Sequence, residues 1–202
     1  MEITTIKTGN SINDLPYYGI VALIFIGAKL IYPHLATDDL KILLTPVSYL
    51  VSFFTGSPMS FSMENGYHLP LLNIVIDKSC SGFNFWLIGF IVVSFSMISS
   101  KNHYLLFGYR AIPELSGRSG RSESHKITGI IASIIIAYIL TILANTSRIV
   151  SIIKMNHIFP TWNEQYEWLH VAQGTFVYLF FLIGFYLFLN YKRHKVLTKI
   201  SK

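Results

Sequence analysis

Charged residues are scarce in this chain. They make up 13% of its 202 residues, while 52% are hydrophobic, and a soluble domain normally has about a quarter of its residues charged. The one cysteine, Cys80, excludes an intramolecular disulfide. The first residues lack a cationic start and a small-residue cleavage pattern, so we expect no removable signal peptide. This composition argues against a soluble globule and predicts an integral membrane protein.

Hydrophobic residues are concentrated in five blocks. The blocks are residues 16–31, 40–55, 82–99, 127–144 and 171–189. A helix needs about 20 apolar residues to cross a bilayer core, and the second block is shorter and contains Pro46. We therefore expect residues 1–202 to form one all-α transmembrane helix bundle. It has five spans, or four spans and a re-entrant second segment, and the fourth helix is expected to continue to about Met155.

Turn-forming residues separate the second block from the third. Asn65-Gly66 lies between short mixed stretches, which is typical of a β-hairpin. We expect a small extracytoplasmic hairpin, or two irregular strands, that lies on the membrane surface and leads the chain to Cys80. No other stretch is predicted to be extended.

The basic residues predict an orientation. Residues 101–126 contain five Lys and Arg, and residues 190–202 contain five more. Because short cytoplasmic connections are enriched in Lys and Arg, we expect a cytoplasmic loop at 100–126 and a cytoplasmic tail at 190–202. The ends of the spans that carry Cys80, Arg148 and His170 would then share the outer face of the membrane.

These three residues are suited to nucleophilic chemistry. Cys80 precedes the head of the third block, where a helix N-terminus favours a thiolate and its N–H groups can bind an oxyanion. His170 heads the last block and titrates near neutral pH, so it can exchange a proton with a thiol. Arg148 follows the fourth block, where its guanidinium can stabilise an oxyanion or bind a carboxylate.

Each of the three residues also has an inert interpretation when taken alone. A free cysteine is usually a buried packing residue, and a histidine beside an interfacial tryptophan is often part of an aromatic belt. Arg148 can pair with lipid phosphate or with Glu164 or Glu167, and one of these glutamates can instead orient His170.

The remaining polar residues predict neither a metal nor a cofactor. The other histidines are scattered through different segments and lack a metal-ligand spacing. Asp38, Asp39 and Asp77 are interpreted as solvated loop charges. The spans contain few charges, which disfavours a transporter.

Taken together, the motifs resemble the exosortase and archaeosortase family of multi-spanning cysteine transpeptidases. They are Cys80-Ser81-Gly82, Asn145 with Arg148, and His170 with Gly174, in the family's order. The resemblance covers about residues 71–189, and the short chain is closest to the exosortase K subgroup.

The resemblance implies a thiol protease and transpeptidase of the bacterial inner membrane. Its partners would be exported proteins that end in a short motif, a transmembrane helix and a basic tail, with no nucleic acid involved. Cys80 would form a thioester with the scissile carbonyl, Arg148 would hold the oxyanion and His170 would handle the proton. Four residues would support them: Ser81, Gly82, Asn145 and Gly174.

The second product of the reaction depends on the acceptor. The acceptor would be a lipid-linked or cell-surface nucleophile, or water. The alternative function is a noncatalytic membrane component of a polysaccharide or surface-protein export assembly, in which Cys80, Arg148 and His170 only pack or bind lipid.

Overall fold

The protein is a bundle of long apolar helices. A computed structural model describes residues 14–99, 120–158 and 168–200. In these residues, four helices are long and apolar enough to cross a membrane. They are α1 (Leu15–Ile31), α3 (Phe83–Ser99), α5 (Gly120–Ile158) and α7 (Trp168–Ile200). The prediction of an all-α membrane helix bundle is confirmed.

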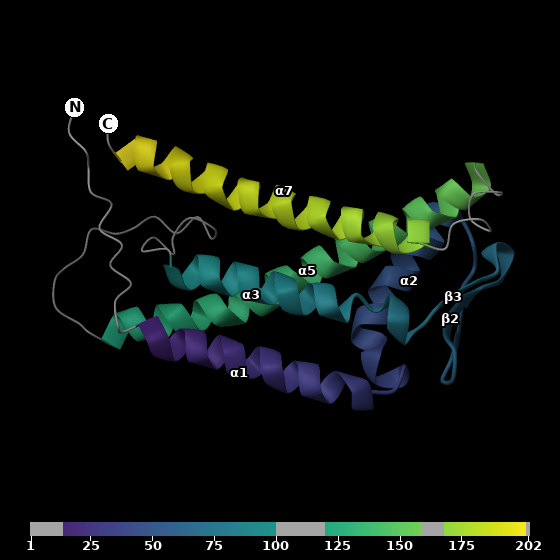
Figure 1. Ribbon diagram of the computed structural model, residues 1–202, viewed down its shortest axis with the longest axis horizontal. Helices are drawn as coiled ribbons and strands as arrows, with labels where there is room; N and C mark the ends of the chain where they lie inside the picture. The colour runs from purple at the N-terminus through teal and green to yellow at the C-terminus, as the bar shows by residue number, and fades with distance from the viewer. Residues whose placement is uncertain (1–13, 100–119, 159–167, 201–202) are drawn as a thin grey trace.

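The four helices lie along one axis with alternating chain direction (Figure 1). Helix α3 packs against α1 on one side and α5 on the other, and α7 packs on α5. As a result, the start of α3, the end of α5 and the start of α7 lie at the same end of the bundle. The start of α1 and the end of α7 lie at the opposite end.

Helix α2 (Lys41–Thr55) is the counterpart of the second apolar block. Its 15 residues reach about 22 Å at 1.5 Å per residue, short of the ~30 Å core of a bilayer. Its buried residues are Leu43, Leu44, Val47, Ser48 and Val51, and they pack against α5 and the strands. The structure therefore has four helices of spanning length and a shorter α2 at one end of the bundle.

Pro46 leaves a backbone carbonyl of α2 without its usual donor. Proline has no N–H, so the helix cannot bond the carbonyl four residues earlier, which belongs to Ile42. The hydroxyl of Tyr138 on α5 donates to that carbonyl at 2.7 Å. Pro46 thus leaves a carbonyl of α2 free to accept a hydrogen bond, and α5 holds α2 through that bond.

The predicted hairpin is present and has a third strand. Strands β1 (Ser60–Ser62), β2 (Gly66–Leu69) and β3 (Ile74–Ile76) form an antiparallel sheet in that order. Gly66 turns the chain with φ +88°, and a Cβ there would lie 2.5 Å from the carbonyl oxygen of Ile76. The sheet lies beside α2 at the same end of the bundle (Figure 1) and leads directly to Cys80.

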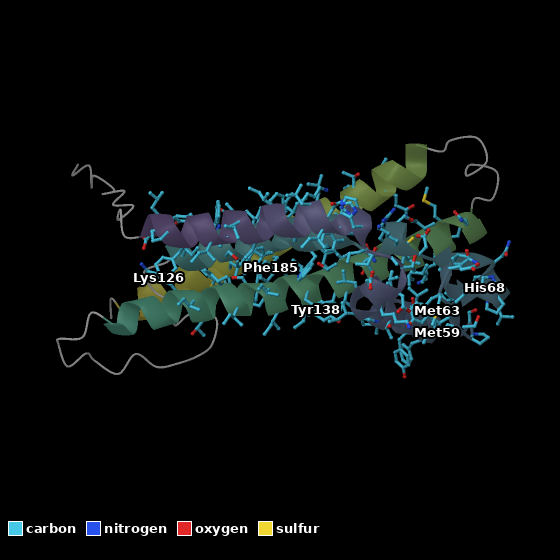
Figure 2. The ribbon with its side chains drawn as sticks, turned by 90° about the horizontal axis from the view of Figure 1, so that it is seen from below. Met59, Met63, His68, Lys126, Tyr138 and Phe185 are labelled. Atoms are coloured by element: carbon cyan, nitrogen blue, oxygen red, sulfur yellow. The ribbon has the colours of Figure 1, made fainter. Side chains whose placement is uncertain are left out.

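Helix α5 is longer than the apolar block that predicted it. It begins at Gly120, so residues 120–126 of the predicted loop are helical, whereas residues 100–119 lie outside the described residues. The polar start of α5 is held by an ion pair between Lys126 and Asp14, and the Lys126 amine lies 4.8 Å from the centre of the Tyr17 ring. This contact fixes α5 to the start of α1, at the opposite end from His68 on the sheet (Figure 2).

Helices α5 and α7 also extend beyond their other apolar limits. As expected, α5 continues past Ala144, and it ends at Ile158. Helix α7 continues through residues 190–200 of the predicted tail. Both extensions are rich in polar residues, which a helix tolerates once its apolar part is packed.

Replacing Tyr138 with phenylalanine should weaken the attachment of α2. We expect Tyr138→Phe to lower the free energy of unfolding by about 0.5–1.5 kcal/mol, because the Ile42 carbonyl loses its donor. Denaturant unfolding in detergent micelles measures the change. In a Pro46→Ala background the backbone N–H of residue 46 can replace the tyrosine, so the cost should fall well below that value. Equal costs in the two backgrounds would contradict this role for Tyr138.

Candidate functional site

Cys80 ends a short 3-10 turn, η5 (Lys78–Cys80), that precedes α3. The Asp77 carboxylate starts the turn by accepting hydrogen bonds from the Ser79 N–H at 2.9 Å and the Ser79 hydroxyl at 2.6 Å. The Cys80 N–H donates to the Asp77 carbonyl at 3.0 Å. Asp77 is therefore a partly exposed loop residue that also caps the turn.

The backbone amides around Cys80 are used within this loop. Besides the amides of Ser79 and Cys80, the Ser81 N–H donates to the Lys78 carbonyl at 3.1 Å, and the Phe83 N–H donates to the Ser81 hydroxyl at 3.3 Å. We expected N–H groups here to stabilise a thiolate or an oxyanion. Four of these N–H groups close the loop, so they are not the donors that would bind a thiolate or an oxyanion.

The end of α1 holds the same loop. The Tyr32 hydroxyl donates to the Lys78 carbonyl at 3.1 Å, and the Tyr32 ring stacks on Phe83 at 4.3 Å. The Lys78 amine donates to the carbonyls of Leu35 at 2.6 Å and Pro33 at 3.1 Å. The ammonium of Lys78 is thus engaged with the chain after α1, and its role here is structural.

Gly82 lets the loop approach α5 closely. Its φ is +68°, a conformation that residues with a Cβ rarely adopt. A Cβ there would lie 3.0 Å from the Thr141 methyl group and 3.4 Å from the side-chain amide of Asn145. Position 82 therefore requires glycine for two reasons: the backbone has a positive φ, and a side chain would collide with α5.

A chain of hydrogen bonds connects Cys80 to Arg148. The fully buried Asn145 donates from its side-chain nitrogen to the Cys80 carbonyl. The Asn145 side-chain oxygen accepts from the Tyr178 hydroxyl at 3.0 Å, and the same hydroxyl accepts from Arg148 Nη1 at 3.3 Å. Residues from the loop before α3, from α5 and from α7 are thereby joined in one polar cluster.

Gly174 brings α7 against the guanidinium of Arg148. A Cβ on Gly174 would lie 2.7 Å from Arg148 Nε. His170 is in the first turn of α7, and its side chain lies outside the described residues. Residues four apart share one face of a helix, so His170 lies one turn further along the face of α7 that contacts Arg148.

The positive charge of Arg148 has no carboxylate partner among the described residues. Their ion pairs are Lys41 with Asp38 and Lys126 with Asp14, and Arg148 Nε is buried without an acceptor. Glu164 and Glu167, considered above as partners, lie outside the described residues. An arginine in such a position within a membrane bundle is costly and usually functional.

The described residues contain no cluster of three or more His, Cys, Asp and Glu side chains that could hold a metal ion. The polar cluster at Cys80 consists of an amide, a phenol and a guanidinium, which are not a typical metal ligand set. Its chemistry is therefore that of hydrogen bonding and positive charge.

The structure brings together Cys80, Ser81, Gly82, Asn145, Arg148 and Gly174, and it places the backbone of His170 one turn from Gly174. Sequence reasoning missed Tyr178, which is one of 12 tyrosines in the chain and lies within an aromatic run that is typical of a lipid-facing helix. The available signal was its spacing of four residues after Gly174, which predicts a shared helix face.

Alanine at Gly82 should destabilise the protein more than alanine at Gly56. Both glycines have φ +68°, but a Cβ on Gly56 meets nothing within 4 Å. We expect about 1–2 kcal/mol of strain for Gly56→Ala, and about 3 kcal/mol or more for Gly82→Ala, where crowding against α5 is added. Unfolding of both variants in the same detergent measures the difference. If both variants lose the same free energy of unfolding, crowding against Thr141 and Asn145 does not contribute to the effect of Gly82→Ala.

Similarity to known proteins adds no information about this site. Comparisons with protein-family models, with curated proteins and with solved structures found no match to the chain. Its function is therefore inferred from its own residues and their geometry.

Proposed function

We propose that this protein is a membrane-embedded thiol peptidase and transpeptidase of the exosortase and archaeosortase type. The observation that carries the proposal is the hydrogen-bonded connection from the Cys80 carbonyl through Asn145 and Tyr178 to Arg148. It links the backbone of a residue with a partly exposed thiol to a guanidinium without a described counter-ion. A nucleophile and a stabiliser of negative charge are the two groups that acyl transfer requires first.

The proposed substrate is an exported protein whose C-terminus carries a short motif, a transmembrane helix and a basic tail. The site would face the outside of a bacterial inner membrane, with residues 100–126 and the C-terminus in the cytoplasm. Cys80 directly precedes α3, and the start of α3 lies at one end of the bundle (Figure 1), which supports this arrangement. A substrate helix in the same bilayer would present its scissile bond at the depth of Cys80, which lowers the entropic cost of a productive encounter.

In the proposed first step, the Cys80 thiolate attacks the scissile carbonyl carbon. A carbon–sulfur bond forms and the carbonyl oxygen becomes an oxyanion, to which Arg148 donates hydrogen bonds. When the intermediate collapses, the carbon–nitrogen bond breaks and the leaving amine takes a proton from His170. The product that stays on the enzyme is a thioester at Cys80.

In the second step an acceptor attacks the thioester. His170 takes a proton from the amine, hydroxyl or water that attacks, and the carbon–sulfur bond breaks to regenerate the thiolate. Arg148 stabilises the second oxyanion as it did the first, because the same carbonyl oxygen carries the charge. The acceptor would be a lipid-linked or cell-surface nucleophile, or water in the case of hydrolysis.

A noncatalytic role in an export assembly is the competing hypothesis. It requires Cys80 to be a packing residue, and Cys80 does pack against the apolar core formed by α2, the sheet, α3 and α5. Its side chain is nevertheless partly exposed. The neighbouring Ser79 is exposed, and its hydroxyl lies 3.8 Å from the Cys80 sulfur. The exposed part of the thiol is what favours the catalytic hypothesis.

Substitution of the three proposed catalytic residues tests the function. The substrate is a co-expressed reporter that ends in a candidate motif, an apolar helix and a basic tail, and immunoblotting follows its cleavage. We expect Cys80→Ala and Cys80→Ser to abolish cleavage, Arg148→Ala to slow it about 10²–10³-fold, and His170→Ala to slow it about 10²-fold or more. The membrane level of each variant is measured in parallel.

Two further variants serve as matched controls. Lys154→Ala removes an exposed cation from the same helix as Arg148, and His68→Ala removes a histidine from the sheet. Both should cleave the reporter at the wild-type rate. Normal cleavage by Cys80→Ala would exclude the thiol mechanism and favour the assembly role.

Gly174→Ala should impair the site while leaving the helix intact. The added methyl group would displace the guanidinium of Arg148, whereas a Cβ on Gly184 of the same helix meets nothing within 4 Å. We expect Gly174→Ala to slow reporter cleavage about tenfold or more, because small displacements of a stabilising group are costly. Gly184→Ala should cleave normally. Equal rates for the two variants would contradict the contact between α7 and Arg148.

A further inference from the structure

We propose that Tyr178 is a positioning residue that restrains the Asn145 side chain and thereby the position of Cys80 relative to Arg148. Tyr178 lies on α7, whereas Asn145 and Arg148 lie on α5. Its relevance to catalysis rests on the function proposed above, but its effect on the Cys80 loop does not.

The donors and acceptors of the cluster determine one arrangement. Arg148 Nη1 can only donate, so the Tyr178 oxygen accepts from it and the Tyr178 hydrogen remains for another partner. That hydrogen goes to the side-chain oxygen of Asn145, which can only accept. The Asn145 nitrogen is then the atom that faces the Cys80 carbonyl.

The Cys80 carbonyl sets the orientation of the amide, because a carbonyl oxygen can accept only from the Asn145 nitrogen. The Tyr178 hydroxyl satisfies the other end of the amide by donating to the Asn145 side-chain oxygen. Because Asn145 is fully buried, losing this donor would leave a buried polar group unsatisfied, at a cost of about 1–3 kcal/mol. The Tyr178 hydroxyl therefore restrains the side chain that holds the Cys80 loop.

The ring of Tyr178 is held separately from its hydroxyl. It stacks on Phe85 of α3, with the ring centres 4.6 Å apart and the planes at 21°, and the Arg148 guanidinium carbon lies 5.6 Å from its centre. Phenylalanine at position 178 would keep the stacking and lose the hydrogen bonds. Tyr178→Phe is consequently a clean test of the hydroxyl.

This arrangement gives α7 a direct effect on the nucleophile. Many of its large apolar residues are exposed, among them Phe176, Leu179, Phe180 and Ile183. The contacts of Gly174 and Tyr178 with Arg148 are thus the polar part of an otherwise apolar attachment to α5. Through Tyr178, movement of α7 would reach the backbone of Cys80.

The experiment measures alkylation of Cys80 by N-ethylmaleimide in the full-length protein in detergent. Cys80 is the one cysteine in the chain, so the reagent reports on this thiol alone. We expect Tyr178→Phe to raise the alkylation rate about threefold or more, because Asn145 loses one of the two hydrogen bonds that hold its side chain against the Cys80 loop. Tyr186→Phe, on the exposed side of the same helix, should react at the wild-type rate.

A double substitution separates this role from general loosening of the bundle. If Tyr178 acts through Asn145, then Tyr178→Phe should not change the alkylation rate further in an Asn145→Ala background. In the reporter assay, Tyr178→Phe should lower cleavage about tenfold, and it should have little further effect in an Arg148→Ala background.

The outcomes distinguish the two proposals. An alkylation rate for Tyr178→Phe equal to that of Tyr186→Phe, or independent effects of Tyr178→Phe and Asn145→Ala, would overturn the positioning role. If alkylation changes as expected but Cys80→Ala still cleaves the reporter, Tyr178 positions the loop and the peptidase proposal fails.

Discussion

The hydrogen bond from the Asn145 side chain to the Cys80 carbonyl is the contact on which the arrangement of the site depends. It attaches an irregular loop to the middle of a long helix, and Gly82 allows the close approach that it requires. The Asn145 side chain is fully buried, and a buried polar group needs a hydrogen-bond partner. Removing the contact would free the loop from α5.

The same requirement explains the position of α2. Pro46 leaves the Ile42 carbonyl without a helical donor, and the Tyr138 hydroxyl supplies one from α5. At both places α5 provides the polar side chain that an irregular backbone needs. Helix α5 therefore acts as the common support of α2, of the Cys80 loop and of α7, which contacts it through Arg148.

Packing alone does not explain why an arginine occupies position 148. Its Nε is buried without an acceptor, and no carboxylate among the described residues pairs with it. A site that stabilises a developing oxyanion provides a reason, because the missing negative charge then arrives with the reaction. This is the physical link between the geometry of the cluster and the proposed acyl transfer.

The sequence by itself determined the apolar helices, the turn at Asn65-Gly66, and the grouping of Cys80, Arg148 and His170 at one end. These features follow from the length of apolar runs, from local turn chemistry and from alternating chain direction. Tertiary structure alone decided that Lys78 binds carbonyls after α1 and that Tyr178 joins Asn145 to Arg148. Such contacts connect residues from different elements, and one-dimensional patterns contain no information on which side chains of two packed helices meet.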